Sequence, residues 1–307
     1  MDNEIINSIF TENGLWKISN IKKLNIWFTN EVYNIDDKYI LKICLDVENE
    51  KNFKKEVFLS KYFQNKIPVP EVIIYDNSKK ILNNDFIIYK KISWVNLYSK
   101  WHLLKNKDRK IIINNLCSIL GFINKVDFLS LKKDLDINLG KSWKELILEE
   151  INNSLEKLSQ NMILEDNFVL KIRNYVKKNK EVLNEVSIWL LHTDIHFDNI
   201  LINDDNEIIW ILDFERSRIW SIDFELDIIR RMQEFPKKYI CQEYEEYAKD
   251  EDYESLMYWF NEFYWELFNF KNLEIRLNLY SINHDLDTLI SYPNDQKLKE
   301  YIKKIID

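Results

Sequence analysis

The first ninety residues alternate apolar and polar positions in short runs, a pattern typical of β-strands. Two of these runs flank Asp36 and Asp37, and the acidic pair favours a tight hairpin turn. One longer segment, Asn49–Gln64, spaces apolar residues among charged ones and predicts the one helix of this region. Pro68 and Pro70 cannot continue that helix, because proline lacks an amide donor. The predicted strands are Ile18–Phe28, Glu31–Ile35, Tyr39–Cys44, Val72–Tyr75 and Asp85–Ile92.

From about residue 100 the apolar positions recur at helical spacing instead. The stripes consist of Ile112, Leu116, Ile119, Leu120 and Ile123; of Trp143, Leu146, Ile147, Ile151, Leu155 and Leu158; and of Leu256, Phe260, Tyr264, Leu267 and Phe268. Short extended segments interrupt them at Ile188–Leu191, Ile200–Ile202 and Ile208–Leu212. A β-rich part, residues 1–92, followed by a mostly helical part, residues 93–307, predicts an α+β fold with two lobes and a cleft between them.

The composition is that of an ordinary soluble chain. Apolar residues make up 46% and charged residues 31% of the 307 positions, which excludes a mostly disordered protein. No apolar run reaches the roughly 18 residues that span a bilayer, and the acidic N-terminus does not match a secretory signal. The net charge of −8 disfavours binding to nucleic acid. Cys44, Cys117 and Cys241 cannot all pair with one another, which favours the reducing cytoplasm.

The segment from His192 to Asp213 carries the candidate chemistry. Asp194 and Asn199 are five residues apart, and Asp213 follows an apolar strand fourteen residues after Asn199. Phosphoryl transfer needs a carboxylate that orients the attacking hydroxyl and accepts its proton. It also needs oxygen ligands for magnesium, which neutralises charge on the phosphates. The spacing therefore favours a kinase-type catalytic loop, with Asp194 as the base and Asn199 and Asp213 as Mg²⁺ ligands.

The same residues resemble the aminoglycoside phosphotransferase family, the small-molecule branch of the protein-kinase-like fold. The catalytic loop of that family reads approximately His-Gly-Asp-x-His-x-x-Asn, and here His192-Thr-Asp-Ile-His-Phe-Asp-Asn199 matches it with Thr193 in place of glycine. Its metal motif, Ile-Asp-Trp or Ile-Asp-Phe, is Leu-Asp-Phe here, with Asp213 at its centre. The resemblance implies a two-lobed kinase-like fold. It also implies that the catalytic loop is supported by His192, His196 and either Glu225 or Asp227, a choice that the spacing leaves open.

The resemblance extends into the β-rich part. Lys42 is similar to the strand lysine that meets the nucleotide phosphates, and Glu56 to the helix glutamate that pairs with it. With only three glycines in the chain, the glycine-rich phosphate loops are absent. The other residues that the resemblance assigns to the nucleotide are Thr29 and Asn30 in the phosphate loop and Tyr89, Lys90, Lys91 and Ile92 in the hinge. The sequence does not distinguish ATP from GTP as the donor.

Two rival interpretations use the same residues. His192, Asp194 and His196, with Asp213 added, form a reasonable first shell for a metal-dependent hydrolase. That interpretation leaves Asn199, Lys42 and Glu56 without roles. The other rival is a kinase-like fold that has lost its activity and serves as a binding module, which the intact motif residues argue against.

The acceptor is indicated only by an acidic run, Glu243–Glu254, which carries seven acids and one lysine. Such a run is either a solvated face or an acidic wall that attracts a polycation. Aminoglycosides are polycations, so the second interpretation predicts acceptor contacts at Glu245, Glu246, Asp250 and Asp252. Choline kinases are the main alternative within the resemblance, and homoserine, methylthioribose and macrolide kinases remain open. We expect a monomer or a weak dimer.

Overall fold

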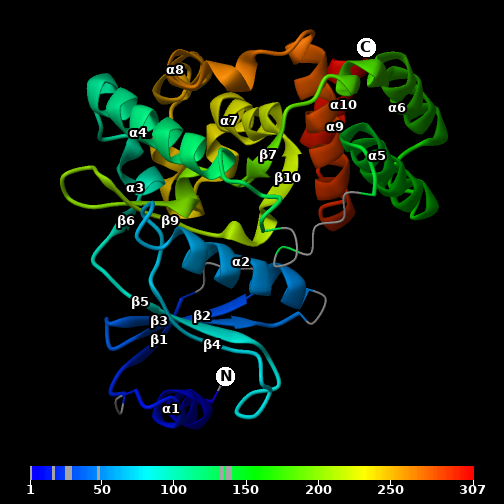
Figure 1. The fold of residues 1–307 in the computed structure, drawn as a ribbon. Helices are drawn as coiled ribbons and strands as arrows, with labels where there is room; N and C mark the ends of the chain where they lie inside the picture. The colour runs from blue at the N-terminus through cyan, green and yellow to red at the C-terminus, as the bar shows by residue number, and fades with distance from the viewer. Residues whose placement is uncertain (1, 16–17, 25–29, 47–48, 132–134, 136–139) are drawn as a thin grey trace.

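The computed structural model describes residues 2–15, 18–24, 30–46, 49–131, 135 and 140–307. The chain forms two lobes, a β-sheet lobe from the N-terminal part and a larger, mostly helical lobe from the rest (Figure 1). The two-lobed α+β fold predicted from the sequence is thus confirmed. In Figure 1 the sheet lobe lies below and the helical lobe above, with helix α2 (Glu50–Phe63) between the sheet and the helical lobe.

The N-terminal lobe is built on a five-stranded antiparallel sheet with the order β1-β2-β3-β5-β4. Its strands are β1 (Ile21–Leu24), β2 (Asn30–Ile35), β3 (Tyr39–Cys44), β4 (Val72–Asp76) and β5 (Phe86–Lys90). The predicted hairpin joins β2 to β3, and Asp36 and Asp37 both adopt positive φ angles, 52° and 54°, as its tight turn requires. The register places Lys42 of β3 between Val32 of β2 and Ile87 of β5, in the middle of the sheet.

The prediction of a single helix in this lobe is wrong, because α1 (Asn3–Glu12) precedes the sheet. The side chain of Asp2 accepts a hydrogen bond from the amide of Glu4 and caps the first turn. Ile6, Ile9 and Phe10, at helical spacing, are buried in a core with the sheet residues. In Figure 1, α1 lies on the side of the sheet away from α2, so each face of the sheet is covered by one helix.

The C-terminal lobe consists of helices around two small sheets. The helices are α3 (Leu97–Trp101), α4 (Asn106–Asn124), α5 (Trp143–Gln160), α6 (Asp166–Asn179), α7 (Glu225–Glu234), α8 (Leu256–Phe263), α9 (Leu273–Ser291) and α10 (Gln296–Ile306). One sheet has the order β6-β8-β9, from β6 (Val95–Asn96), β8 (Ile200–Ile202) and β9 (Ile208–Ile211), and the other pairs β7 (Ile188–Leu191) with β10 (Arg218–Ser221). The helices predicted around 112–123 and 143–158 are confirmed.

The stripe predicted from Leu256 to Phe268 is not one helix. The backbone leaves the helical region at Tyr264, with φ −146° and ψ 61°, and a short 3₁₀ turn follows at Trp265–Phe268. The hydroxyl group of Tyr264 donates a buried hydrogen bond to the side chain of Asn124 in α4. This tertiary contact holds the break at a position where the sequence has no helix-breaking residue.

Helix α2 belongs to two hydrophobic cores. Phe53 and Val57 pack with sheet residues, whereas Leu59 and Phe63 pack in the large core of the C-terminal lobe. One helix therefore contributes side chains to the cores of both lobes, and Glu56 is next to Val57 on it. None of the helices in the described part of the chain combines the length and the apolar composition that crossing a membrane requires.

Candidate active site

The loop between β7 and β8 holds the catalytic-loop residues from His192 to Asn199. Its position is set by hydrogen bonds of its backbone and of a histidine ring with Leu212, which follows β9. The amide of Leu212 donates to the carbonyl of Asn199 at 2.9 Å, which places the end of β9 beside the loop. The Nε2 atom of His192 lies 2.8 Å from the carbonyl of Leu212. Asp194, Asn199 and Asp213 are thereby brought to one place, as the sequence predicts they would be for phosphoryl transfer.

His192 is completely buried, and both of its ring nitrogens already have partners. Nε2 meets the carbonyl of Leu212, and Nδ1 accepts the amide of Asp194 at 3.3 Å. Burial lowers the pKa of His192 to about 4, so the ring is neutral at pH 7. A ring with no free nitrogen cannot also bind a metal, which argues against the hydrolase interpretation. Among the described residues, the acidic, His and Cys side chains close enough to share an ion are Glu56, Asp213 and Glu215, with no histidine.

Thr193, which stands where the resembling family has glycine, adopts a left-handed backbone with φ 66°. This conformation is costly for a β-branched residue, by about 1–2 kcal/mol. The carboxylate of Glu225 holds the strained segment by accepting the amides of His192 at 2.6 Å and of Thr193 at 3.1 Å. Burial raises the pKa of Glu225 to about 7.

Glu225 and Asp227, the two acids that the sequence left as alternatives, have different partners in the structure. Glu225 contacts the catalytic loop, whereas Asp227 is part of an ion-pair network with Arg231 of its own helix, 3.2 Å away. Asp227 also accepts the hydroxyl of Ser281 and lies 3.5 Å from the ring of His284, both in α9. Asp227 thus connects α7 to α9 and does not touch the loop amides.

His196 lies between the catalytic loop residues. Its Nε2 atom is 3.5 Å from a carboxylate oxygen of Asp194 and 3.2 Å from Nδ2 of Asn199. The same Nδ2 donates to the carbonyl of Asp194 at 2.9 Å. The amide group of Asn199 is therefore held by its nitrogen, which leaves its side-chain oxygen for a ligand such as a divalent cation.

Lys42 and Glu56 meet as the sequence predicts. Lys42 Nζ lies 2.7 Å from Glu56 Oε2, and the other oxygen of Glu56 accepts the hydroxyl of Tyr89 at 2.8 Å. Although burial alone would lower it, the carboxylates of Glu56, Asp213 and Glu215 raise the pKa of Lys42. The lysine is therefore a buried, permanently charged cation at the boundary of the two lobes.

Glu215 is a site residue that the sequence analysis missed. Its carboxylate reaches from the C-terminal lobe to Lys42 Nζ, 2.7 Å away, and accepts the side-chain amides of Asn30 and Asn49. The signal was present in the Asp-Phe-Glu order after β9, but nothing in the sequence indicated partners 166 and 185 residues away. Glu215 ties β2, β3 and the start of α2 to the segment that follows Asp213.

Asp213 combines a left-handed backbone, φ 63°, with a buried carboxylate whose Oδ1 atom has no hydrogen-bond partner. Burial raises the pKa of Asp213 to about 6, against the opposing effect of Lys42. An orphaned buried carboxylate oxygen is costly unless a cation satisfies it. Hard oxygen donors from Asp213 and Asn199 fit magnesium.

A narrow apolar cavity opens beside Lys42 between the lobes. Its apolar walls are Leu24, Val32, Ile40 and Tyr89 from the sheet lobe and Trp94, Leu201, Trp210 and Leu212 from the linker and the other lobe. Lys90 and Lys91 are not among its lining residues and pair with Glu71 and Asp37, at 3.4 Å and 3.3 Å. Thr29 lies outside the described residues, Asn30 faces Glu215, and Ile92 is not among the residues that line the cavity.

The comparisons with known proteins agree with this geometry. The phosphotransferase enzyme family matches residues 20–257. The chain belongs to this family. A comparison with curated protein sequences gives no match. Similar solved structures, at 14–16% identity, are aminoglycoside phosphotransferases, so their likeness shows the fold.

Three of these structures cover nearly the whole phosphotransferase chain. The streptomycin–ATP ternary complex of APH(2")-IIa is 16% identical, with a TM-score of 0.69 over 100% of this chain and 96% of the other. The ADP-bound aminoglycoside phosphotransferase APH(2'')-Ib is 15% identical, with a TM-score of 0.67 over 100% and 97%. The GDP and kanamycin complex of APH(2")-IIia is 14% identical, with a TM-score of 0.71 over 99% and 97%.

The acidic run of the phosphotransferase packs against α3 and α4. The ring of Tyr244 meets Tyr98, and the ring of Tyr247 stacks on His102. Glu245, Glu246 and Asp250 are exposed. Asp252 differs from the other three candidate acids, because it forms a 2.6 Å ion pair with the buried Arg109.

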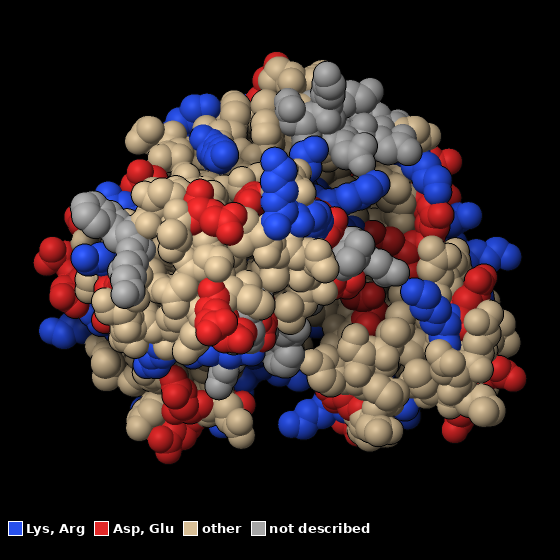
Figure 2. Space-filling view, turned by 90° about the horizontal axis from the view of Figure 1, so that it is seen from below, with Lys and Arg blue, Asp and Glu red and all other residues tan. Residues whose placement is uncertain are grey.

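The surface near the run is of mixed charge. Asp250 lines a cavity whose other charged residues are Glu234, Lys237, Lys238, Lys297, Glu300 and Lys304. Seen from below, the phosphotransferase is hollowed on one side, and acidic side chains are visible deep inside the hollow (Figure 2). The small-molecule phosphotransferase thus has a buried acidic centre at the lobe junction and a mixed surface around the acidic run.

Proposed function

We propose that this phosphotransferase transfers the γ-phosphoryl group of ATP or GTP to a hydroxyl group of an aminoglycoside-like acceptor. The observation that carries the proposal is that Asp213 meets the Lys42–Glu56 pair at the wall of one apolar cavity, next to the loop that carries Asp194 and Asn199. The cavity offers apolar walls for a purine, and the charged residues Lys42, Glu56 and Asp213 also line it. The three free cysteines, of which Cys44 and Cys117 are buried, support the cytoplasmic location that the sequence predicts.

Asp194 acts on the acceptor. Its side chain is 20% exposed, so an incoming hydroxyl group can reach it while the backbone around it stays fixed. The carboxylate orients that hydroxyl and accepts its proton as the bond to the γ-phosphorus forms and the bond to the bridging oxygen breaks, which releases the nucleoside diphosphate. Glu225 and His192 hold the loop, which keeps Asp194 in place.

Lys42 and Asp213 act on the donor. Magnesium held by Asp213 and Asn199 would neutralise charge on the phosphates. Lys42 is now shared between Glu56 and Glu215, both at 2.7 Å. To bind a phosphate oxygen it has to weaken one of these pairs, and Glu215 is the partner from the other lobe.

An acceptor with several amino groups is supported by the acidic run and by the similar structures. Those structures are described as complexes with streptomycin, gentamicin, kanamycin and hygromycin B. The exposed acids Glu245, Glu246 and Asp250 attract cations over roughly a Debye length, about 8 Å at physiological salt.

The experiment is a product-release assay with Mg²⁺ and either ATP or GTP. The acceptors are streptomycin, gentamicin, kanamycin and hygromycin B, with choline and homoserine as the alternatives. We expect turnover with at least one aminoglycoside, and a loss of about 10²- to 10⁴-fold in the Asp194→Asn variant because the base is removed. Turnover with choline or homoserine alone would contradict the aminoglycoside assignment while keeping the kinase mechanism.

The role of the acidic run has a test of its own. Glu245→Gln, Glu246→Gln and Asp250→Asn together should lower kcat/KM for the cationic acceptor and flatten its dependence on salt. Asp252 stays unchanged because Arg109 depends on it. The matched control neutralises three exposed acids elsewhere, Glu12, Glu156 and Asp166. Equal effects of the two triple variants would make the run a solvated face.

A further inference from the structure

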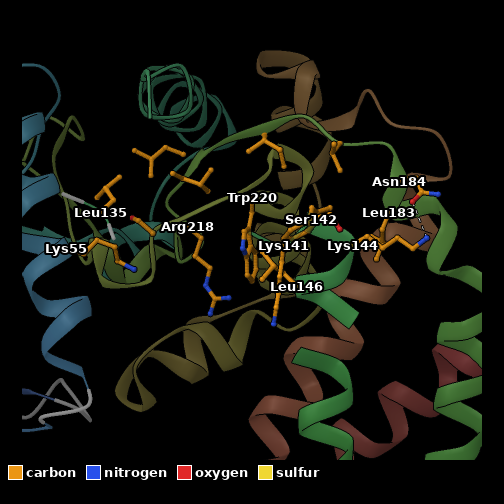
Figure 3. Close-up of a pocket in the computed structure, with 16 residues that line it drawn as sticks. Lys55, Leu135, Lys141, Ser142, Lys144, Leu146, Leu183, Asn184, Arg218 and Trp220 are labelled. Atoms are coloured by element: carbon orange, nitrogen blue, oxygen red, sulfur yellow. Dashed lines mark hydrogen bonds between the residues drawn. The ribbon is translucent and has the colours of Figure 1, made fainter. Parts of the chain in front are cut away.

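A second cavity, of about 460 Å³, lies on another side of the lobe junction from the one beside Lys42, and the two share no lining residue. It is enclosed by α2, by the start of α5, and by β7 and β10 (Figure 3). Nothing in the proposed phosphotransfer uses it.

Among the described residues, the charged ones that line this cavity are all cations. They are Lys55 from α2, Lys141 and Lys144 at the start of α5, and Arg218 from β10. No aspartate or glutamate is found among the described residues that line it. In a chain with a net charge of −8, four cations around one cavity, with no acid among its described lining residues, are a local excess that attracts anions.

Three of these cations have carboxylate partners outside the cavity. Arg218 pairs with Glu150 at 2.6 Å, Lys144 with Glu181 at 2.7 Å, and Lys141 with Glu149. These partners hold the three side chains at the wall of the cavity while leaving donors for a ligand.

Lys55 is different, because its hydrogen-bond partner is the neutral side chain of Asn52, 3.3 Å away, and no carboxylate in the described part of the chain forms an ion pair with it. Burial and the nearby charge of Arg218 lower the pKa of Lys55 to about 8, while Glu215 and Asp213 oppose the shift. A half-buried ammonium group without a counterion is unfavourable, and an anion in the cavity would relieve it.

The remaining walls are apolar. They include the indole rings of Trp143 and Trp220 and the aliphatic side chains of Leu146, Leu183, Val186 and Ile188. The guanidinium group of Arg218 lies over the Trp220 ring, 4.0 Å from its centroid, and so joins the charged wall to the aromatic one. The cavity thus suits a molecule that carries a negative group on an aromatic or aliphatic body.

We propose that this cavity is a binding site for an amphipathic organic anion, whose acidic group bridges Lys55 of α2 and Arg218 of β10. Lys55 is the residue before Glu56, and Arg218 is three residues after Glu215. An anion between them joins α2 to the C-terminal lobe next to the two carboxylates that hold Lys42. Occupation of the cavity therefore favours the arrangement of the lobes seen here, and by linkage any ligand that needs this arrangement binds more tightly.

The probe for this site is naphthalene-2-sulfonate, and its neutral counterpart is 2-naphthol. Binding is followed by calorimetry and by quenching of tryptophan fluorescence, with excess Mg-ADP present to fill the nucleotide cavity. We expect the sulfonate to bind, and 2-naphthol to bind at least about tenfold more weakly, because a charge-assisted hydrogen bond contributes about 1.5–3 kcal/mol. Equal affinities of the two compounds would overturn the proposal.

Variants locate the site. Lys55→Gln with Arg218→Gln should weaken sulfonate binding about tenfold or more, whereas Lys55→Arg should keep it. The matched control is Lys54→Gln, since Lys54 is the exposed neighbour on the same helix and does not line the cavity. Unchanged binding in the double variant, or an equal loss in the Lys54 control, would place the anion elsewhere.

The outcome is independent of the proposed kinase activity. If the chain transfers no phosphoryl group, sulfonate binding that depends on Lys55 and Arg218 still supports this site. Conversely, an active kinase whose sulfonate affinity ignores both residues refutes the site and leaves the proposed function intact.

Discussion

Two buried ionic clusters in this protein differ in how completely their charges and hydrogen bonds are satisfied. The Arg276 cluster, in the C-terminal lobe, is complete. Arg276 donates to both oxygens of Asp223, at 2.6 Å and 2.9 Å, and Ser221 and Tyr280 donate to the same carboxylate. The guanidinium group also donates to the carbonyl of Glu185 at 2.7 Å. One cation faces one anion, and neither ionic side chain is exposed.

The Lys42 cluster, at the lobe junction, is incomplete. One ammonium group faces the carboxylates of Glu56, Asp213 and Glu215, and Asp213 keeps an oxygen without a partner. If all three acids are ionised, the cluster carries a net charge of −2. Burial raises the pKa of Asp213, which favours its neutral form and so reduces this negative charge.

The difference separates a structural cluster from a functional one. A complete ion pair holds parts of the fold together, and removing one partner leaves the other buried and uncompensated. An incomplete cluster makes the empty protein less stable than it could be, and a ligand of opposite charge recovers that free energy on binding. The comparison can be tested by changing each cluster in turn.

The largest effect is expected at Asp213. Asp213→Asn should lower Mg²⁺-dependent turnover by about a thousandfold or more, because a metal ligand is lost. The same change should raise the free energy of unfolding without metal at pH 7 by about 1–2 kcal/mol, because it removes a buried charge whose pKa is raised. Denaturant unfolding without Mg²⁺ measures the second effect, and a less stable variant would contradict the proposed imbalance.

The Arg276 cluster should respond in the opposite way. Arg276→Met leaves Asp223 buried without its cation and should lower the free energy of unfolding by about 3–5 kcal/mol. Affinity for Mg-nucleotide, measured by calorimetry on the folded fraction at low temperature, should stay near that of the parent. Loss of nucleotide affinity in fully folded protein would show that the two clusters are coupled.

Magnesium binding by the Lys42 cluster should depend on pH. The pKa of Asp213 is raised to about 6 in the folded protein, so the proton competes with Mg²⁺ below that pH. Magnesium affinity should be nearly constant above pH 7 and should fall about tenfold per pH unit well below pH 6. The Asp213→Asn variant should show little of this dependence. An unchanged slope in the variant would assign the titration to another group.

The smallest effect concerns the backbone beside the Lys42 cluster. Thr193→Ala loses the hydrogen bond from the hydroxyl to the carbonyl of Arg216 and keeps the strain of the left-handed backbone. Thr193→Gly loses the same hydrogen bond but also relieves the strain. Thr193→Gly should therefore be more stable than Thr193→Ala by about 0.5–1 kcal/mol, after the entropic cost of glycine. Thermal unfolding of the two variants checks this order.

The sequence predicted the elements whose signals are local. The hairpin around Asp36 and the helix that carries Glu56 follow from turn chemistry and periodicity. Helix α1 was missed although Asp2 and the spacing of Ile6 and Phe10 were available, because its face is buried only by a sheet formed further along the chain. The single helix predicted through Tyr264 was wrong because a contact 140 residues away decides that break.

In the site, too, the sequence predicted what depends on local spacing and missed what depends on long-range contacts. Asp194 and Asn199 belong to one short loop, so their spacing alone predicts that they meet. Glu225 and Asp227 are two residues apart in the first turn of a helix and are separated by about 160° around its axis, so only the packed structure shows which one faces the loop. Glu215 was not assigned because its partners in the other lobe are distant in the sequence.

The placement of α2 in two cores has a consequence for cooperativity. Leu59 and Phe63 pack with the C-terminal lobe, while Phe53 and Val57 of the same helix pack with the sheet. Neither lobe can lose its core without exposing apolar side chains of the other, so the boundary between the lobes is not a boundary between independent folding units. Amide hydrogens of α2 and of the central strand β3 should therefore exchange only through global unfolding, and the two lobes should melt in one transition.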